Sequence, residues 1–224
     1  MEEREGWIEF SPTGRLEPFS MEVPGDPSSA AFLVGAAVLA ERGALRIERV
    51  GLNPTRTGFL DVLRRMGARV AVEGVAARFD EPVGDLVAGP AELSGTEVAA
   101  GEIPTLIDEI PLLAALASRA RGATVFRAVG ELRVKESDRL GLLAENLRAV
   151  GARADVVGDD LHIEGSDSPP RGRVHIAGDH RLAMAFAVLG TVPGGRVVVD
   201  DLECAAVSFP DFPATLRSIR SNPR

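Results

Sequence analysis

The chain has 224 residues, of which 45% are hydrophobic and 26% charged, the proportions of a globular protein large enough to bury a substantial core. Its 25 lysines and arginines against 33 aspartates and glutamates give a net charge of −8, which excludes the broad basic surface of a protein that coats DNA or RNA. With no tyrosine and only 4% aromatic residues, it also lacks stacking platforms for bases. Any phosphate ligand must therefore be held at a local site.

The sequence carries no pattern for membrane insertion or export. Its longest weakly polar run, from Ala30 to Ala40, is too short to span a bilayer. The acidic opening, Met1 to Glu5, lacks the basic and apolar regions of a signal peptide. The single cysteine, Cys204, has no partner for a disulfide within the chain, as is usual in a reducing compartment. We therefore expect a cytoplasmic protein.

The first twenty residues differ from the rest of the chain. A strand pattern from Trp7 to Phe10 is followed by turn-forming residues at positions 11–14. We interpret residues 1–20 as a residual segment of a preceding domain or linker. Residues 21–224 read as one domain, because no linker interrupts them.

Three similar units make up that domain when the apolar helical runs are aligned on the glycine that follows each of them. Gly43, Gly122 and Gly195 are separated by 79 and 73 positions, which is too long for a solenoid repeat. The pattern predicts an α/β fold of three related units packed around a common axis. We place the units at about 21–80, 81–165 and 172–224.

Each unit reads as helix, strand and helix, and in the first two a pair of short strands follows. The first unit has helices at 30–40 and 59–66 and strands at 43–48, 69–72 and 77–79. The second has helices at 112–120 and 138–150 and strands at 122–127, 153–157 and 160–164. The third has helices at 182–189 and 213–219 and a strand at 195–200.

Aspartates stand at related helix starts in the three units, at Asp26, Asp108 and Asp179. Asp26 followed by Pro27 fits an N-cap and the first helical position. Ser137 likewise fits an N-cap before the second helix of the second unit. Capping or loop hydrogen bonding is the structural interpretation of each of these side chains.

Cations occupy the first turns of two helices, where they oppose the helix dipole and do not help local stability. Lys135 and Arg139 belong to the charged loop 131–139, and His180 and Arg181 open the first helix of the third unit. If the helices of the three units are parallel, their amino-terminal ends open on one face. Free N–H groups and these cations then form a local anion site within an acidic protein.

Two carboxylates suit proton transfer at different atoms of a bound substrate. Asp108 lies in the same unit as the charged loop and would serve as a base, while Glu136 within the loop would serve as an acid. The neighbouring Glu109 is a competing base that spacing alone does not exclude.

The sequence gives no support for a metal or a nucleotide cofactor. His162 and His175 lie in strand patterns, and Cys204 reads as a small packed residue, so no zinc-ligand spacing is present. Glycine-rich nucleotide-binding patterns are absent from the sequence. We therefore expect neither a metal site nor a cofactor.

Five stretches of the sequence closely resemble the 5-enolpyruvylshikimate-3-phosphate (EPSP) synthase family, in a match that covers nearly the whole chain. The most specific are Leu-Arg-Val-Lys-Glu-Ser-Asp-Arg at 132–139 and Gly-Asp-His-Arg at 178–181. The others are Ile-Asp-Glu-Ile-Pro at 107–111, Pro-Gly-Asp-Pro-Ser-Ser-Ala at 24–30 and Asn-Pro-Thr-Arg at 53–56. The resemblance implies a two-domain enzyme, each domain being half of an inside-out α/β barrel built from three βαβαββ units, and this chain resembles the carboxy-terminal domain.

The resemblance also implies an activity. The family transfers the enolpyruvyl group of phosphoenolpyruvate to the 5-hydroxyl of shikimate 3-phosphate and releases phosphate, without a cofactor. This reaction belongs to the shikimate pathway, which leads to chorismate and the aromatic amino acids. The implied partners are the two substrates and the amino-terminal domain of the same enzyme.

Site residues are implied position by position. Asp108 resembles the carboxylate that takes the proton from the 5-hydroxyl, and Glu136 resembles the residue that protonates the methylene carbon of phosphoenolpyruvate and later recovers that proton. Asp108 and Lys135 resemble residues that contact shikimate 3-phosphate. The residues that resemble the phosphoenolpyruvate-binding set are Lys135, Arg139, His180 and Arg181.

The sequence also departs from the family pattern. The Pro-Gly-Ser-Lys-Ser segment and the motifs of the other domain are missing, and Val207 stands where some members have a lysine that contacts phosphoenolpyruvate. We therefore expect this chain to lack full turnover alone. Two alternatives stand beside the main interpretation: a domain of the related enolpyruvyl transferase acting on a uridine-diphosphate sugar, and a non-catalytic anion-binding module of the same fold.

Overall fold

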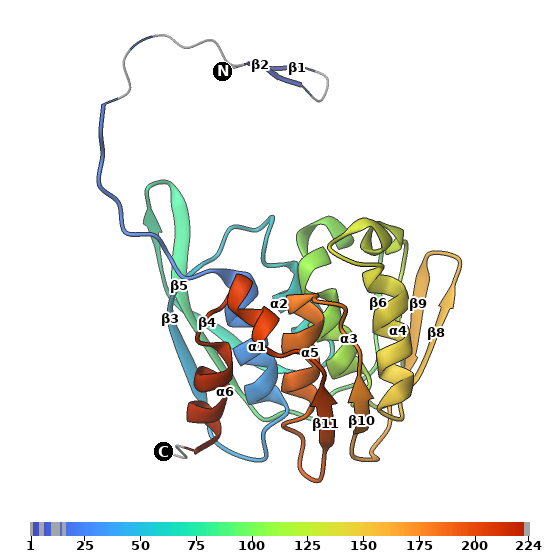
Figure 1. The fold of residues 1–224 in the computed structure, drawn as a ribbon. Helices are drawn as coiled ribbons and strands as arrows, with labels where there is room; N and C mark the ends of the chain where they lie inside the picture. Colours follow the sequence, from blue (N-terminus) through green and yellow to red (C-terminus); the bar gives the residue numbers. More distant parts are fainter. Residues whose placement is uncertain (1, 5–6, 10–13, 15–16, 222–224) are drawn as a thin grey trace.

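The structure is a computed structural model that describes residues 2–4, 7–9, 14 and 17–221 (Figure 1). Near the amino terminus, β1 (Glu2–Arg4) and β2 (Trp7–Glu9) pair in antiparallel orientation. Phe10 and positions 11–13, which belong to the predicted strand and turn, lie outside the described residues. Within the described part of the chain, every helix is too short or too polar to cross a membrane.

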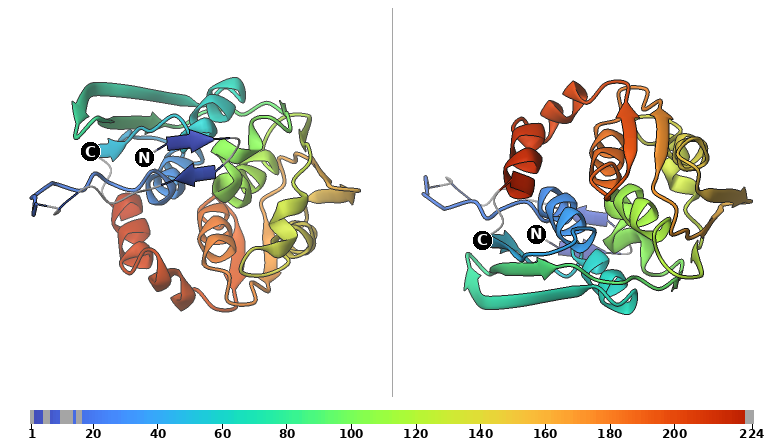
Figure 2. Two further views of the ribbon diagram at one scale, coloured as in Figure 1. Left: turned by 90° about the horizontal axis from the view of Figure 1, so that it is seen from above. Right: turned by 90° about the horizontal axis from the view of Figure 1, so that it is seen from below.

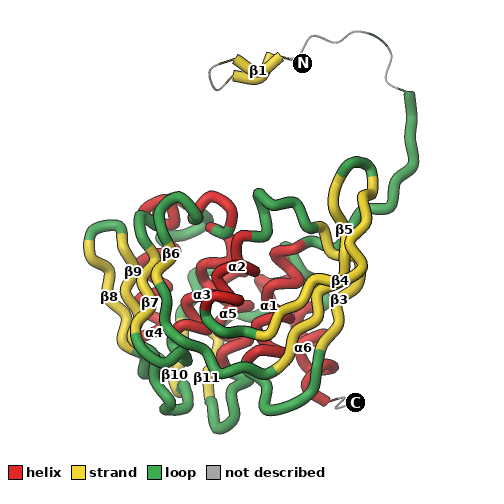
Figure 3. Tube along the Cα trace, turned by 180° about the vertical axis from the view of Figure 1, so that it is seen from behind, coloured by secondary structure: helices red, strands yellow, loops and turns green. Residues whose placement is uncertain are grey.

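Three apolar helices form the centre of the molecule: α1 (Pro27–Val38), α3 (Ile110–Ala117) and α5 (His180–Leu189). All eight residues of α3 are buried, because a helix that is apolar on every face is stable only when other elements surround it. The three helices contact one another, and the remaining elements lie around them (Figure 2). Seen from behind, the central helices lie between the sheet of β3–β5 and the sheet of β6–β9 (Figure 3).

Three further helices lie farther out and are amphipathic or end in charged residues: α2 (Gly58–Arg65), α4 (Arg139–Ala149) and α6 (Phe212–Ser221). In α2 the apolar side chains are buried on one face, while the last turn carries two arginines that suit the negative end of the helix dipole. These helices confirm the predictions at 59–66, 138–150 and 213–219 to within two residues.

The first sheet has the order β3 (Leu45–Gly51), β5 (Glu81–Gly89), β4 (Arg69–Arg78), and all its pairs are antiparallel. The predicted strand pair 69–72 with 77–79 is wrong, because both pieces belong to β4. Gly74, which resembles a turn residue, sits at an irregularity in the ladder with φ of +60°.

The true turn of that hairpin is formed by Phe79 and Asp80, with φ of 50° and 63°. Its second strand, β5, therefore begins after residue 80 and pairs with both neighbours. The first sheet extends to Gly89, past the boundary at 80 expected for the first unit.

The second sheet has the order β6 (Glu97–Val98), β7 (Ala123–Phe126), β9 (Asp160–Glu164), β8 (Arg153–Val157). The pair β6–β7 is parallel and the other two pairs are antiparallel. The two-residue connection between β8 and β9 makes the tight hairpin that the sequence predicts at 153–157 and 160–164.

The third sheet has two parallel strands, β10 (Arg171–Val174) and β11 (Arg196–Val199). His175 lies after β10, and its side chain is 73% exposed and contacts Asp200, so its prediction as a strand residue is wrong. His162 lies in β9 as predicted. Cys204 packs partly buried in the short helix η4 (Glu203–Val207), and burial raises the pKa of its thiol to about 11.

The helix caps are partly as predicted. Asp26 accepts a hydrogen bond from the backbone N–H of Ser29, and Asp179 accepts one from each of two backbone N–H groups, so both are N-caps. The prediction for Ser137 is wrong: α4 starts at Arg139, and Asp138 caps it. The cap position moves because the carboxylate of Asp138 reaches the N–H three residues on, whereas the Ser137 hydroxyl bonds elsewhere.

Candidate active site

The amino-terminal ends of α1, α3 and α5 lie at the upper end of the molecule in Figure 1. The short helix η2 (Ile107–Glu109) leads into α3, and the chain enters α4 nearby through the charged loop. Ion pairs join these helix starts across long sequence distances. The structure thereby brings together four of the predicted site residues, which are Asp108, Glu136, Arg139 and Arg181.

Arg139 has a fully buried side chain that is surrounded by carboxylates. Its Nε lies 2.8 Å from Asp179 Oδ2, and its Nη2 lies 2.5 Å from Glu136 Oε2. Its Nη1 lies 3.9 Å from Asp108 Oδ1 and has no hydrogen-bond partner among the described residues. A buried charged donor without a partner is costly, so this N–H group is the one that an anionic ligand would satisfy.

Asp179 has a second task besides capping α5, because it is the counter-ion of Arg139. Its carboxylate accepts two hydrogen bonds from that guanidinium and one, of 3.0 Å, from the Ser137 hydroxyl. Burial alone would raise the pKa of Asp179, but the arginine, the backbone N–H of Leu182 and the serine hold it below its ordinary value. Asp179 therefore stays ionised and fixes Arg139 in place.

Asp108 and Arg181 form the second ion pair of the site. Arg181 Nη2 lies 3.2 Å from Asp108 Oδ2, and Nη1 donates a 3.3 Å hydrogen bond to the Asp108 carbonyl. The Asp108 carboxylate therefore lies between two guanidinium groups, of Arg181 and of Arg139. Its side chain is 33% exposed, which leaves it accessible to a ligand.

Glu109 occupies a different environment from its neighbour. Its side chain is 3% exposed, and burial raises the pKa of its carboxyl group in spite of the nearby Arg181, Arg56 and Ser28 hydroxyl. A base must reach the proton that it removes, and a carboxyl group this deeply buried does not reach solvent or a ligand directly.

Two predicted residues stand apart from the ion pairs of the arginines. Lys135 Nζ donates to Glu131 Oε1 at 2.8 Å, in a pair spaced by four residues within the charged loop. His180 is 9% exposed, and burial together with the positive charge of Arg181 lowers the pKa of its imidazole. His180 is therefore biased towards its neutral form beside the arginine.

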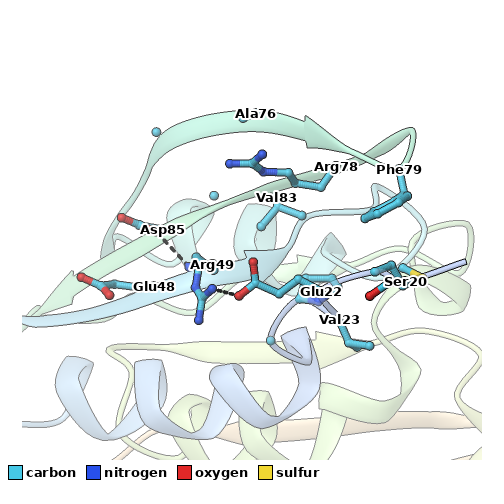
Figure 4. A pocket seen from close by; sticks show the side chains of 15 residues that line it. Ser20, Glu22, Val23, Glu48, Arg49, Ala76, Arg78, Phe79, Val83 and Asp85 are labelled. Carbon is cyan, nitrogen blue, oxygen red and sulfur yellow. Dashed lines mark hydrogen bonds and ion pairs between the residues drawn. The ribbon is translucent and has the colours of Figure 1, made fainter.

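A cavity of about 660 Å³ lies elsewhere, between the chain segment 20–25 and the β4–β5 hairpin (Figure 4). Its lining includes Arg49, Arg78 and Phe79 and none of the predicted site residues. This cavity and the helix-start cluster are therefore separate features of the molecule.

Sequence reasoning missed three residues that support the site. The pairing of Arg139 with Asp179 joins residues 40 positions apart, and spacing carries no signal for it. Glu131 could have been found, because a carboxylate four residues before a lysine is a common ion-pair spacing. Ser137 was taken for a helix cap, whereas its hydroxyl donates to Asp179.

The arrangement combines anion binding with proton transfer. Two guanidinium groups and three helix starts can hold a phosphate or carboxylate, and the partly exposed Asp108 and Glu136 can exchange protons with a ligand held there. Among the described residues, no three His, Cys, Asp or Glu side chains are grouped so as to hold a metal ion.

Solved structures with a similar fold are enolpyruvyl transferases. An EPSP synthase from Acinetobacter baumannii superposes with a TM-score of 0.86 at 36% identity, over 94% of this chain and 48% of that one. The enolpyruvyl transferase NikO from Streptomyces tendae gives a TM-score of 0.64 at 25% identity, over 86% of this chain and 42% of that one. The chain thus has the α/β fold of this class of enzymes.

The sequence comparisons specify the family. Residues 1–216 match the family model described as EPSP synthase (3-phosphoshikimate 1-carboxyvinyltransferase), and the chain belongs to that family. The 3-phosphoshikimate 1-carboxyvinyltransferase of Desulfitobacterium hafniense (strain DSM 10664 / DCB-2) is 47% identical over 190 residues, which are 85% of this chain and 44% of the relative. The one of Desulforamulus reducens is 44% identical over 206 residues, 92% of this chain and 48% of the relative. The chain therefore spans about half the length of the curated relatives that it matches.

Proposed function

We propose that this chain is the carboxy-terminal domain of a cytoplasmic 3-phosphoshikimate 1-carboxyvinyltransferase. In this role it would bind phosphoenolpyruvate and, with an amino-terminal domain, transfer the enolpyruvyl group to the 5-hydroxyl of shikimate 3-phosphate with release of phosphate. The observation that carries the proposal is the buried Arg139, whose unpartnered N–H group lies beside the Asp108–Arg181 pair at three helix starts.

The same proposal includes three related units and a separate amino-terminal segment, residues 1–20. Two observations support the units. In the orders β3–β5–β4 and β6–β7–β9–β8, an inner strand, β5 or β9, is antiparallel to both of its neighbours. In addition, the parallel bridge between Gly25 and Val50 of β3 corresponds to the parallel pair of β6 and β7. An apolar central helix comes before one strand of each sheet: α1 before β3, α3 before β7 and α5 before β11. This repetition would account for three helix starts on one face.

The roles of the site residues follow from their environments. Arg139 and Arg181, with the neutral His180 beside them, would grip the anionic groups of phosphoenolpyruvate. Asp108, which is more accessible than Glu109, would accept the proton of the attacking hydroxyl. A bond then forms between the 5-oxygen and the central carbon of phosphoenolpyruvate while its methylene carbon takes a proton from Glu136.

The second half of the reaction reverses the proton transfer. The tetrahedral ketal loses phosphate, whose leaving oxygen takes the proton held by Asp108, while its methyl group returns a proton to Glu136, so both carboxyl groups are restored for the next turnover. Lys135 would leave Glu131 and contact both substrates, which its flexible stem allows. The chain alone holds these groups but is expected to lack full turnover.

The test is calorimetric titration of the chain with phosphoenolpyruvate and with inorganic phosphate. We expect weak binding that is lost in R139A or R181A. R181A is the cleaner variant, since the Arg181 side chain is 15% exposed, whereas removal of Arg139 leaves the buried Asp179 without its counter-ion.

R153A is the matched control, because Arg153 pairs with Glu164 in the exposed part of the second sheet, and its side chain is 80% exposed. This variant should bind both anions like the unaltered chain. Unchanged binding in both R139A and R181A would remove the assignment of the anion site.

A further inference from the structure

Glu109 is a buried carboxyl group to which the proposed reaction assigns no role. It follows Asp108 in η2, is 2% exposed, and carries an oxygen, Oε1, that has no hydrogen-bond partner among the described residues. Burying a carboxyl group costs free energy unless neighbouring groups compensate it. An apolar side chain would avoid that cost at the start of a helix as apolar as α3.

The neighbours of Glu109 come from three other parts of the fold. Arg181 of α5 places its Nη1 3.8 Å from Glu109 Oε1, and the Ser28 hydroxyl of α1 lies near enough to the carboxyl group to lower its pKa. Ser28 is itself buried and accepts a 3.0 Å hydrogen bond from Arg56, which lies before α2. The charged groups that face Glu109 are thus Arg181, Arg56 and Asp108.

This position places Glu109 behind the ligand-binding arginine. The same Nη1 of Arg181 that faces Glu109 also donates to the Asp108 carbonyl, while Nη2 contacts the Asp108 carboxylate. One edge of the guanidinium therefore faces two consecutive residues of η2, of which the Asp108 carbonyl accepts its hydrogen bond. Long arginine side chains have many rotamers, so such a backing lowers the entropy lost when an anion binds.

We propose that Glu109 is a positioning residue for Arg181: buried beside the guanidinium, its polar side chain holds Arg181 in the orientation that receives the anion. This inference rests on the proposed anion site. It assigns Glu109 no proton transfer and no contact with substrate. It requires a polar group at this place and not a negative charge, so a glutamine should serve as well.

The test compares two variants of similar length, E109Q and E109M, by calorimetric titration with inorganic phosphate. E109Q keeps the polar end of the side chain, and E109M fills the same space without it. We expect E109M to weaken phosphate binding about tenfold and E109Q to stay within about threefold of the unaltered chain. S118A, which removes a buried hydroxyl at the far end of α3, is the control and should leave the affinity unchanged.

A second background shows whether Glu109 acts through Arg181. R181K keeps the charge but loses the planar guanidinium that the backing orients. In this background we expect E109M to weaken phosphate binding by less than about twofold. An equal loss in both backgrounds, or E109Q weakened as much as E109M, would overturn the proposal. If E109M does not fold, S28A takes its place with the same expectations, because it removes the hydroxyl that neighbours the carboxyl group.

The outcome also separates this inference from the proposed function. If the unaltered chain binds no phosphate, the proposed anion site fails, and the thermal midpoints of E109M, R181K and the double variant decide the inference. Shifts that do not add show that Glu109 and Arg181 are coupled. Additive shifts overturn the positioning role.

Discussion

Asp108 lies between two guanidinium groups, so its negative charge competes with any anion for them. Neutralising it in D108N should tighten phosphate binding by about threefold to tenfold, because Arg139 and Arg181 would each lose one of the carboxylates that partly neutralise them. Calorimetric titration at low salt measures the change. The effect should shrink as salt screens the accessible part of the site.

The control for this prediction is D26N, at the corresponding helix start of α1. Asp26 caps its helix and pairs with Arg56 at 3.6 Å, but it contacts neither Arg139 nor Arg181 in the described ion pairs. Asparagine also caps helices well, so stability should change little. Equal tightening in D26N and D108N would show that overall charge, and not the position of Asp108, controls anion binding.

The buried Glu109 predicts a specific pH dependence of stability. Burial raises its folded-state pKa, so its protonated form is favoured on folding, and its contribution to stability is fully present below the ordinary glutamate value of about 4.3. That contribution is lost as the pH rises through the folded-state pKa. E109Q cannot ionise, and it should therefore gain stability relative to the unaltered chain between about pH 4 and neutrality. Chemical unfolding over this interval measures the difference, and a relative loss for E109Q would contradict it.

At this same scale, the sequence predicts the types of residues at the site better than their partners. The cations at helix starts could be predicted because Arg139 and Arg181 oppose the helix dipole, an anomaly visible in the residue order. The choice between Asp108 and Glu109 as the accessible base could not be predicted, because the two residues are adjacent and only the fold buries one of them. The pairing of Lys135 with Glu131 was missed although its spacing is local.

Among the elements, the chain at and just after the end of α3 lies at very short range from Gly165, the residue that follows β9. A methyl group on Gly165 would lie 1.7 Å from the carbonyl oxygen of Ala120 and 3.1 Å from that of Ala117. Backbone atoms cannot turn aside as a side chain can, so G165A should destabilise the fold by about 2–3 kcal/mol. Denaturant unfolding measures this loss.

The comparison for G165A is G101A, because a methyl group on Gly101 meets open space. Gly101 also has an ordinary φ, so alanine there should be neutral or slightly stabilising. If both variants lost a similar amount of stability, the close approach of Gly165 to the backbone at the end of α3 would not explain the loss in G165A.

The positions of helices and strands could be predicted wherever the turn residues that end them are unambiguous. The hairpin of β8 and β9 follows alternating residues with a short turn, and it was predicted correctly. The β4–β5 hairpin is wrongly placed by the strand pair 69–72 and 77–79, because its true turn uses Phe79, a bulky residue that ordinarily avoids positive φ, together with Asp80. Which strand lies inside each sheet depends on pairing across the fold, and local patterns do not encode it.

For the whole molecule, the net charge of −8 and the anion site are compatible because the site is built from few groups. Its cations are held by carboxylates from other helix starts, so the positive field is confined to that end of the molecule. The sequence predicts that the anion site is local, but it does not predict which groups pair there. The ion-pair network itself requires helices α3, α4 and α5 to be brought together by packing of apolar residues far apart in the chain.

The proposed function makes its strongest prediction for the assembled enzyme. In a chimera, this chain replaces the part of the Desulfitobacterium hafniense relative that it matches, at 47% identity over 44% of that protein. We expect phosphate release from phosphoenolpyruvate and shikimate 3-phosphate by the chimera and none by the chain alone. D108A should slow the chimera by about 10²-fold or more, as loss of a general base does, while R153A should not. Turnover by the isolated chain at the chimera's rate would show that one domain suffices, and near-normal turnover in D108A would move the base to another residue.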